Sequence, residues 1–101
     1  PMYTIVRTAV FDQWLARIKN ARGKARIIER IRSAQRGNFG DCEPVGNGVS
    51  EMRIHVGPGY RVYVTRTGAV VYALLCGGTK RSQQRDIARA RAMARLLEEE
   101  E

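Results

Sequence analysis

Apolar and polar residues alternate strictly along residues 51–56, with apolar side chains at the even positions and polar side chains at the odd positions. A period of two is the pattern of a strand that buries one face. Residues 57–59, Gly-Pro-Gly, favour a turn, and the alternation resumes over residues 61–64. These features predict a β-hairpin whose polar side gathers five side chains, namely Glu51, Arg53, His55, Arg61 and Tyr63.

Three further segments place their apolar residues at helical spacing. They predict helices over residues 9–20, 24–36 and 83–97. Thr8 is a suitable N-cap for the first helix, and Gly37 is suited to end the second one in the left-handed conformation. Because only a short connection separates the first two helices, we expect a helical hairpin that covers the apolar, even-numbered face of the β-hairpin.

The remaining segments complete an α+β order. β-Branched residues predict a first strand over residues 3–7, and residues 69–76 are apolar on both faces, as in a strand covered from two sides. Four glycines and a proline predict a loop over residues 37–48, and we expect residues 77–82 to break the last strand. The order β-α-α-β-β-β-α predicts a helical hairpin packed on a four-stranded, mainly antiparallel sheet, with a C-terminal helix and the other sheet face partly open.

The length of the chain fits a single domain over residues 1–101. We expect Pro1 to be a residue added in cloning. We expect the acidic run 98–101 to be disordered, because the helix dipole disfavours acids at a helix C-terminus. There is neither an apolar run of about 18 residues nor a signal-peptide pattern, so the expected location is the cytoplasm, with no membrane partner.

The charge points to a partner rich in phosphate or carboxylate. The chain has 18 basic and 10 acidic residues, and four of the acids are the terminal glutamates, so residues 1–97 carry a net charge of +12. Arginine outnumbers lysine by 15 to 3. The planar guanidinium group matches phosphate geometry and stacks on nucleobases, which favours nucleic acid as the partner.

The composition argues against a metal site or a cofactor. Cys42 and Cys76 are too far apart for a Cys-x-x-Cys pair, and the chain contains one histidine. We expect two reduced thiols, with Cys76 buried in a strand and Cys42 in a loop. The segment 77–80, Gly-Gly-Thr-Lys, lacks the spacing of a nucleotide-binding phosphate loop. It is either a phosphate site at a helix N-terminus or an ordinary strand-to-helix turn.

The polar side of the predicted β-hairpin contains the groups that metal-independent cleavage of RNA requires. Glu51 or His55 is the candidate base that takes the 2′-OH proton. Three cations are candidates for stabilising the phosphorane charge, and Tyr63 is a candidate for stacking or proton transfer. The alternative is a surface ion pair that serves solubility and contributes about 0–1 kcal/mol. The six candidate catalytic residues are Glu51, Arg53, His55, Arg61, Tyr63 and Lys80.

Five motifs, which together span nearly the whole chain, are similar to those of one protein family. They are Phe11-x-x-Trp14-Leu15, Gly37-Asn38-Phe39-Gly40-Asp41, Val45-Gly46-x-Gly48-Val49-x-Glu51-x-Arg53-Ile54, Gly57-Pro58-Gly59-Tyr60-Arg61-Val62-Tyr63 and Leu75-x-Gly77-Gly78-x-Lys80-x-x-Gln83-x-x-Asp86-Ile87. Through them the chain resembles the RelE/ParE superfamily of toxins from type II toxin–antitoxin modules. The resemblance is closest to the HigB-like, phage-derived addiction module killer branch.

The resemblance implies the RelE-like α+β fold and a toxin of the bacterial cytoplasm. It also implies two kinds of partner, a helix-turn-helix antitoxin protein and mRNA on the ribosome, which such toxins cleave as mRNA interferases. Arg61 matches the sheet arginine of the family, Lys80 matches the basic position after the last strand, and Arg53 is a third basic position on the sheet. Further RNA contacts are expected from four residues, Tyr60, Arg81, Arg85 and Arg89.

One departure from the family leaves the chemistry open. Several relatives place a catalytic His or Tyr near the C-terminus, whereas residues 82–101 contain neither. The identity of the base is therefore open, and so is the question of whether the protein is an enzyme. The alternative is a non-catalytic, ParE-like inhibitor of DNA gyrase or another protein, because the fold by itself does not determine the target.

Overall fold

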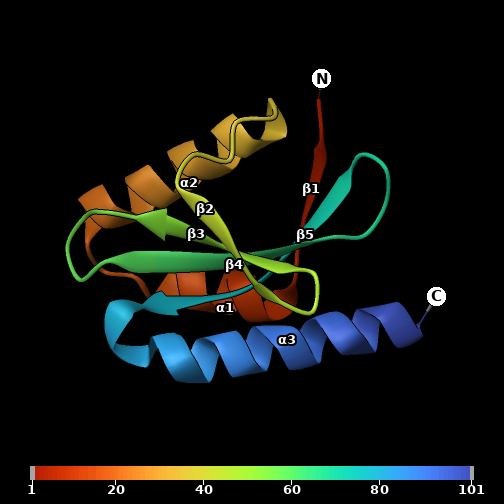
Figure 1. The fold of residues 1–101 in the computed structure, drawn as a ribbon. Coiled ribbons are helices and arrows are strands. Elements are labelled where there is room, and N and C mark those ends of the chain that lie inside the picture. The colour runs from red at the N-terminus through yellow and green to blue at the C-terminus, as the bar shows by residue number, and fades with distance from the viewer. Residues whose placement is uncertain (1, 101) are drawn as a thin grey trace.

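The computed structural model describes residues 2–100, which form one sheet flanked by helices (Figure 1). The elements are β1 (Thr4–Arg7), α1 (Ala9–Arg17), α2 (Ala21–Gln35), β2 (Cys42–Gly46), β3 (Val49–Ile54), β4 (Tyr60–Arg66), β5 (Val71–Thr79), a short 3₁₀ helix η1 (Lys80–Ser82) and α3 (Gln83–Glu99). The α+β class is confirmed. None of the described helices has the length and apolar character needed to cross a membrane.

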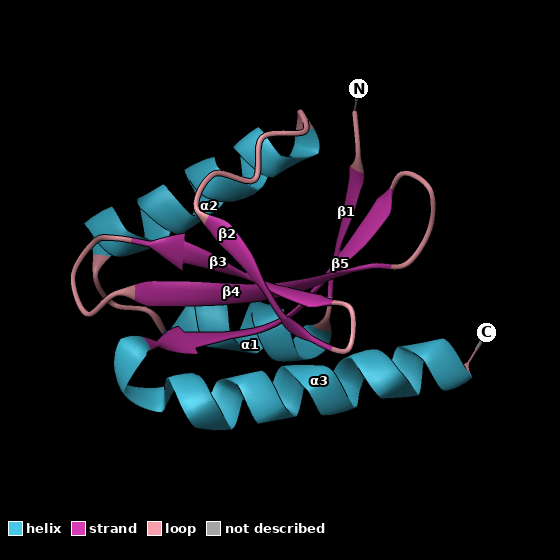
Figure 2. Cartoon of the chain, viewed as in Figure 1, coloured by secondary structure: helices cyan, strands magenta, loops and turns pink. Residues whose placement is uncertain are grey.

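The sheet has five strands instead of the expected four, in the order β1-β5-β4-β3-β2 (Figure 2). β1 pairs with β5 in parallel, and all other neighbours are antiparallel. The additional strand is β2, which lies inside the segment predicted to be a loop. Its glycine and asparagine neighbours form a tight turn at positive φ, with values of 97° at Gly46, 54° at Asn47 and 74° at Gly48. Pro44 is tolerated because β2 is an edge strand with a register irregularity there.

The last strand continues through Gly77 and Gly78, which were expected to break it. Other side chains fill the space where these two residues would carry a Cβ atom. The Trp14 indole lies against Gly77, and the Asp86 carboxylate lies against Gly78. The glycines are therefore required for packing on both sides of β5, and the strand extends to Thr79.

The predicted N-cap of α1 agrees with the structure, whereas the predicted end of α1 does not. Thr8 caps α1, and its hydroxyl oxygen accepts a hydrogen bond of 3.0 Å from the backbone N–H of Phe11. α1 ends at Arg17, three residues earlier than expected, because Asn20 caps α2 by accepting a hydrogen bond of 2.9 Å from the N–H of Gly23. Gly23 therefore lies inside α2 instead of separating the two helices.

The C-terminal end of α2 agrees with the prediction, whereas that of α3 does not. Gly37 follows the end of α2 at a φ of 89°, as predicted. α3 extends to Glu99 with Glu100 as its C-cap, so the described part of the acidic run is helical or caps the helix instead of being disordered. The expectations for Pro1 and Glu101 lie outside the described residues.

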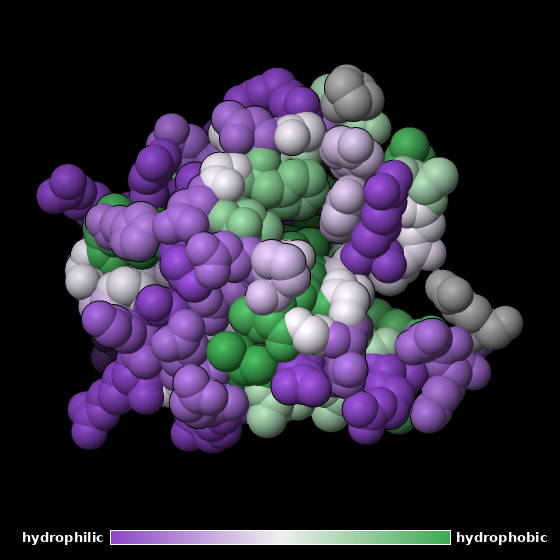
Figure 3. Space-filling view, viewed as in Figure 1, coloured by the Kyte–Doolittle hydropathy of each residue, from purple (hydrophilic) through white to green (hydrophobic). Residues whose placement is uncertain are grey.

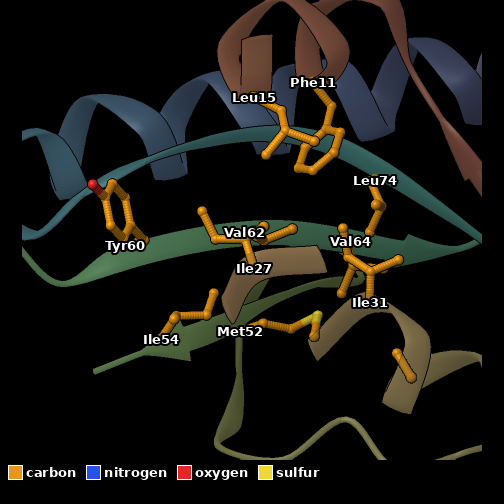
Figure 4. Packing of buried hydrophobic residues seen from close by; sticks show 11 residues of the cluster. Phe11, Leu15, Ile27, Ile31, Met52, Ile54, Tyr60, Val62, Val64 and Leu74 are labelled. Carbon is orange, nitrogen blue, oxygen red and sulfur yellow. The ribbon is translucent and has the colours of Figure 1, made fainter. Parts of the chain in front are cut away.

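The two faces of the sheet are covered by different helices. α1 packs on β5 and α2 packs on β1 and β3, which confirms that both helices lie on the even-numbered face. Their apolar side chains meet those of the sheet in a buried core (Figure 4). α3 crosses the opposite face along β4 and β5, so that face is covered to a greater extent than expected. Its own core contains six buried residues, Val49, Tyr63, Leu75, Cys76, Ala90 and Ala94.

Candidate functional site: a polar network and the cationic end of the sheet

The pairing of β3 with β4 brings the predicted polar residues together. Arg53 lies directly opposite Arg61, and Glu51 lies directly opposite Tyr63. All four occupy the odd-numbered face, as the alternation predicted. Figure 3 shows hydrophilic side chains gathered over the end of the sheet where β3 ends and β4 and α3 begin.

Glu51 is the centre of a buried hydrogen-bond network. Its carboxylate accepts hydrogen bonds from the Tyr63 hydroxyl at 2.9 Å, from the Gln83 amide at 3.0 and 3.2 Å and from Arg53 Nε at 3.1 Å. The Glu51 side chain is 0% exposed. Burial by itself raises the pKa of this carboxyl, but the hydrogen bonds from Gln83, Arg53 and Tyr63 outweigh it, so the pKa lies below its ordinary value. Glu51 is therefore held as a buried carboxylate.

Tyr63 is equally buried, also at 0% exposure. Burial and the hydrogen bond to Glu51 raise the pKa of its phenol, which therefore stays protonated and donates to the carboxylate. Both residues were expected on an accessible face, but they lie beneath α3 and are closed to solvent. The expectation was wrong on this point because alternation identifies the two faces of a strand but not the helix that covers them.

Arg61 and Lys80 meet at one backbone position. Arg61 Nη1 donates a hydrogen bond of 3.0 Å to the carbonyl oxygen of Gly59, and the backbone N–H of Lys80 donates one of 2.9 Å to the same oxygen. Gly59 has a φ of 77°, and a Cβ atom there would lie 3.4 Å from Arg61 Nη1. The turn glycine therefore fixes the place where the arginine head and the start of η1 approach each other.

The Arg61 guanidinium is strongly desolvated. The residue is 8% exposed, and its Nε atom is buried with no hydrogen-bond partner among residues 2–100. That atom lies 3.6 Å from Glu51 Oε2, so the charge is compensated by an ion pair even though the hydrogen bond is not formed. A buried donor without an acceptor is uncommon in proteins and costs about 1–3 kcal/mol, so its retention calls for an explanation.

Arg53 connects the buried network to the surface. Its Nε atom binds Glu51, and its Nη2 atom lies 2.9 Å from Glu43 Oε2 on the neighbouring strand β2. The hydrogen bond to Glu51 raises the pKa of Arg53. The Arg53 side chain is 29% exposed, whereas that of Glu43 is 59% exposed.

His55 lies just beyond the end of β3 and has a partner that the sequence did not indicate. Its Nε2 atom is 2.6 Å from Oδ2 of Asp41, and both side chains are exposed. The hydrogen bond with His55 lowers the pKa of Asp41. The backbone of Asp41 is fixed as well, because its carbonyl oxygen accepts a 2.9 Å hydrogen bond from the N–H of Arg53. Asp41 was missed because the strand that brings it there, β2, was read as a loop, and Gln83 was missed because only the fold places it over Glu51.

The four expected RNA contacts separate into two groups. Arg81, Arg85 and Arg89 are exposed along η1 and α3. Tyr60 is 7% exposed and faces the opposite side of the sheet, where its ring lies 6.3 Å from that of Trp14 and contacts Gly23. Tyr60 is therefore a core residue, as its even-numbered position in the alternation implies, and the structure does not bring it to the arginines.

The thiols and acids of the described residues do not form a metal site. No group of three His, Cys, Asp or Glu side chains with the spacing for a metal ion occurs among residues 2–100. Cys76 is buried in β5, and burial raises the pKa of its thiol to about 11. Cys42 is half-buried in β2, not in a loop, and burial raises its pKa as well.

Comparison with known proteins gives a relative over nearly the whole chain. An uncharacterized protein of Haemophilus influenzae is 47% identical over 93 residues, which cover 92% of this chain and 94% of that protein. The chain therefore belongs to the same family as this Haemophilus protein. No family model matches the chain.

Proposed function

We propose that the protein is the toxin of a type II toxin–antitoxin module, acting in the bacterial cytoplasm as a ribosome-dependent mRNA endonuclease of the RelE/HigB kind. One observation carries the proposal. Arg53, Arg61 and Lys80, here called the cationic sheet end, lie at one end of the sheet, and Arg53 donates its backbone N–H to Asp41, whose carboxylate contacts the exposed His55. Cations beside a potential base are what cleavage of a phosphodiester without a metal ion requires.

His55 is the best candidate for the base. Its side chain is 73% exposed, so RNA can reach it, whereas the alternative base Glu51 is fully buried. In the proposed step, His55 removes the 2′-OH proton and the 2′-oxygen attacks the adjacent phosphorus. The bond from phosphorus to the 5′-oxygen breaks, leaving a 2′,3′-cyclic phosphate, and the departing oxygen takes a proton from water. The His55 imidazolium then gives its proton to the hydroxide that remains, which regenerates the base. Asp41 orients the ring and stabilises the imidazolium that forms.

The buried network has a positioning role in this proposal. The Glu51 carboxylate forms ion pairs with Arg53 and Arg61. Hydrogen bonds donated by Tyr63 and Gln83 in turn fix the position of Glu51. Fixed cations stabilise developing charge better than mobile ones, because no reorganisation is needed when the phosphorane forms. The poorly satisfied Arg61 Nε is consistent with an arginine kept for function rather than for stability.

The test is cleavage of mRNA in cells after induction of the wild-type chain and its variants. Primer extension is expected to show new 5′ ends spaced by codons. His55→Ala is expected to reduce cleavage by about 100-fold or more, the usual contribution of a positioned base. Arg61→Ala is expected to abolish it, and Asp41→Asn is expected to reduce it less than His55→Ala does. Arg32→Ala, an exposed arginine on α2, is the matched control and is expected to cleave normally.

A second function is favoured by the burial of Glu51 and Tyr63. Because three of the six candidate catalytic groups, Glu51, Tyr63 and Arg61, are buried, a non-catalytic inhibitor of DNA gyrase or another protein is the alternative. Under that alternative, induced cells stop growing with intact mRNA and with raised DNA-damage signalling. Cleavage that persists unchanged in His55→Ala would instead remove histidine from the mechanism while leaving the nuclease in place.

The proposed partner in the resting module is a helix-turn-helix antitoxin. We expect an acidic segment of that protein to cover the cationic sheet end or the arginines of α3, since opposite charges steer and stabilise such complexes. Dissociation of the complex is expected to accelerate as salt increases. Dissociation that is independent of salt would contradict an electrostatic interface.

A further inference from the structure

A groove of about 250 Å³ lies between α1 and α3, along the last residues of β5. Three arginines stand on its two walls, Arg17 from α1 and Arg85 and Arg89 from α3, and all three are exposed. The groove shares Thr79, Ser82 and Arg85 with a second hollow that contains Arg81. Arg81 follows Lys80 in η1, so this second hollow lies next along the chain from the cationic sheet end.

The charge of the groove is largely uncompensated. Asp86 is the one acid that lines it, but this residue is 5% exposed and its Oδ2 atom accepts a 2.5 Å hydrogen bond from the Ser82 hydroxyl. Arg85 Nε lies 3.8 Å from Asp86 Oδ1 with a side chain that is 82% exposed, so that ion pair is weak. The groove is therefore suited to an anionic ligand.

The apolar wall of the groove distinguishes between two anionic ligands. The half-buried Trp14 lines the groove and lies against Gly77. β1 pairs with β5 over Val71–Leu74, and the Trp14 indole of α1 packs against Gly77 near the end of β5. An acidic peptide would pair with the arginines but has no base to stack on the indole, whereas an indole among arginines is the arrangement that binds single-stranded RNA, in which a base stacks and the phosphates pair with the cations.

We propose that this groove binds the single-stranded RNA segment that continues beyond the cationic sheet end. Arg17, Arg85 and Arg89 contact phosphates, and one base packs against the Trp14 indole. This inference rests on the proposed function for the identity of the ligand. It adds a binding site on α1, an element that has no role in the proposed cleavage step. Under this inference α1 contributes to the affinity for the RNA substrate.

The test measures binding separately from cleavage. The probe is a fluorescently labelled RNA oligonucleotide of about ten residues with 2′-O-methyl groups, which cannot be cleaved through its 2′-oxygens. Binding is followed by anisotropy, and in the wild-type protein also by quenching of Trp14, the single tryptophan of the chain. The full-length test variant is Arg17→Ala with Arg89→Ala. Its control is Arg32→Ala with Arg36→Ala, which removes the same charge from exposed positions on α2 and at its C-cap.

The test variant is expected to bind at least tenfold more weakly than the control, and the slope of log K against log salt is expected to fall by about 1.4, or 0.7 for each lost phosphate contact on a single strand. Trp14→Phe is expected to weaken binding severalfold while the protein remains folded. Equal affinity and salt slope in the test and control variants would overturn the inference, as would binding of an acidic peptide but not RNA.

The outcomes also separate this inference from the proposed function. His55→Ala is expected to bind the oligonucleotide normally while cleavage is lost. If the wild-type protein binds RNA through the groove but never cleaves mRNA, the inference about the groove is supported and the proposed nuclease activity is contradicted. If the wild-type protein cleaves mRNA and the groove variants bind and cleave like the control, the proposed nuclease activity is supported and the inference about the groove is contradicted.

Discussion

The two faces of the sheet are built on opposite principles. The even-numbered face is a dry core, in which Met52, Val62 and Val64 pack against Phe11 and Ile27 at exposures of 0–2%. The odd-numbered face has an apolar cluster under α3 as well, but it also buries the Glu51 carboxylate and the Tyr63 phenol at 0% exposure and the Arg61 guanidinium at 8%. The even-numbered core is apolar, whereas the odd-numbered face contains charged groups in fixed positions that reach the surface at Arg53, whose side chain is 29% exposed.

The two faces differ in how burial contributes to stability. Hydrophobic burial on the even face stabilises the fold at about 25 cal/mol per Å² of apolar surface. On the odd face, desolvating Glu51 and Arg61 costs free energy that only their mutual contacts offset. Such a network is weak evidence for stability, but it fixes the positions of Arg53 and Arg61 at the end of the sheet.

The largest expected effect is on the apolar face. Phe11→Ala removes a ring that is 0% exposed and is expected to lower the free energy of unfolding by about 4 kcal/mol, because the helices cannot collapse into the cavity. Urea denaturation followed by circular dichroism measures it. Val6→Ala, at a side chain 48% exposed, is the control and is expected to change stability by less than about 0.5 kcal/mol. A small effect of Phe11→Ala would mean that the helices are loosely packed.

The next largest effect is on the polar face. Glu51→Gln keeps the shape but removes the charge opposite Arg53 and Arg61, and its amide donors face those of Gln83. We expect a loss of about 2–3 kcal/mol, the cost of leaving a buried polar group unsatisfied. We also expect mRNA cleavage to fall, although Glu51 touches no substrate, because the arginines lose their support. Normal cleavage by a folded Glu51→Gln protein would contradict the positioning role.

Tyr63→Phe is expected to cost less, about 1 kcal/mol, because it removes one hydrogen bond while Gln83 and Arg53 still satisfy Glu51. The same denaturation experiment measures it. A double-mutant cycle with Glu51→Gln gives the coupling between the two residues directly. Strict additivity of the two substitutions would show that the 2.9 Å hydrogen bond contributes nothing.

The smallest expected effect is the pH dependence of stability. The folded pKa of Glu51 lies below its ordinary value, so the carboxylate contributes stability that is complete above the unfolded pKa of about 4.3 and is lost as pH falls through the folded pKa. The contribution is measured as the difference in unfolding free energy between wild type and Glu51→Gln across the acid range. A difference that stayed constant on acidification would contradict the lowered pKa.

The sequence patterns predicted most helices and strands, but they did not predict which helix covers each face of the sheet. The alternation in residues 51–64 identified which side chains share a face, and even the burial of Tyr60 follows from its parity. The helical stripes and the cap at Thr8 were equally local features. β2 was missed because its glycines were taken as evidence against a strand, although they form the turn that follows it.

Only the part of the candidate site that comes from one local segment was predicted from the sequence. Arg53 and Arg61 come from one hairpin, so local pairing brings them together. Asp41 and Gln83 come from segments that reach the site through β2 and α3, and nothing in the pattern along the chain indicates those contacts.

The sequence by itself determined the alternation, the helical stripes, the positive charge and the absence of a cysteine or histidine cluster, because each depends on residues near one another along the chain. Only the tertiary structure decided that α3 closes the odd face. That placement depends on contacts between distant residues, such as Gln83 with Glu51 and Asp86 with Gly78. It buried Glu51 and Tyr63 and left His55 accessible.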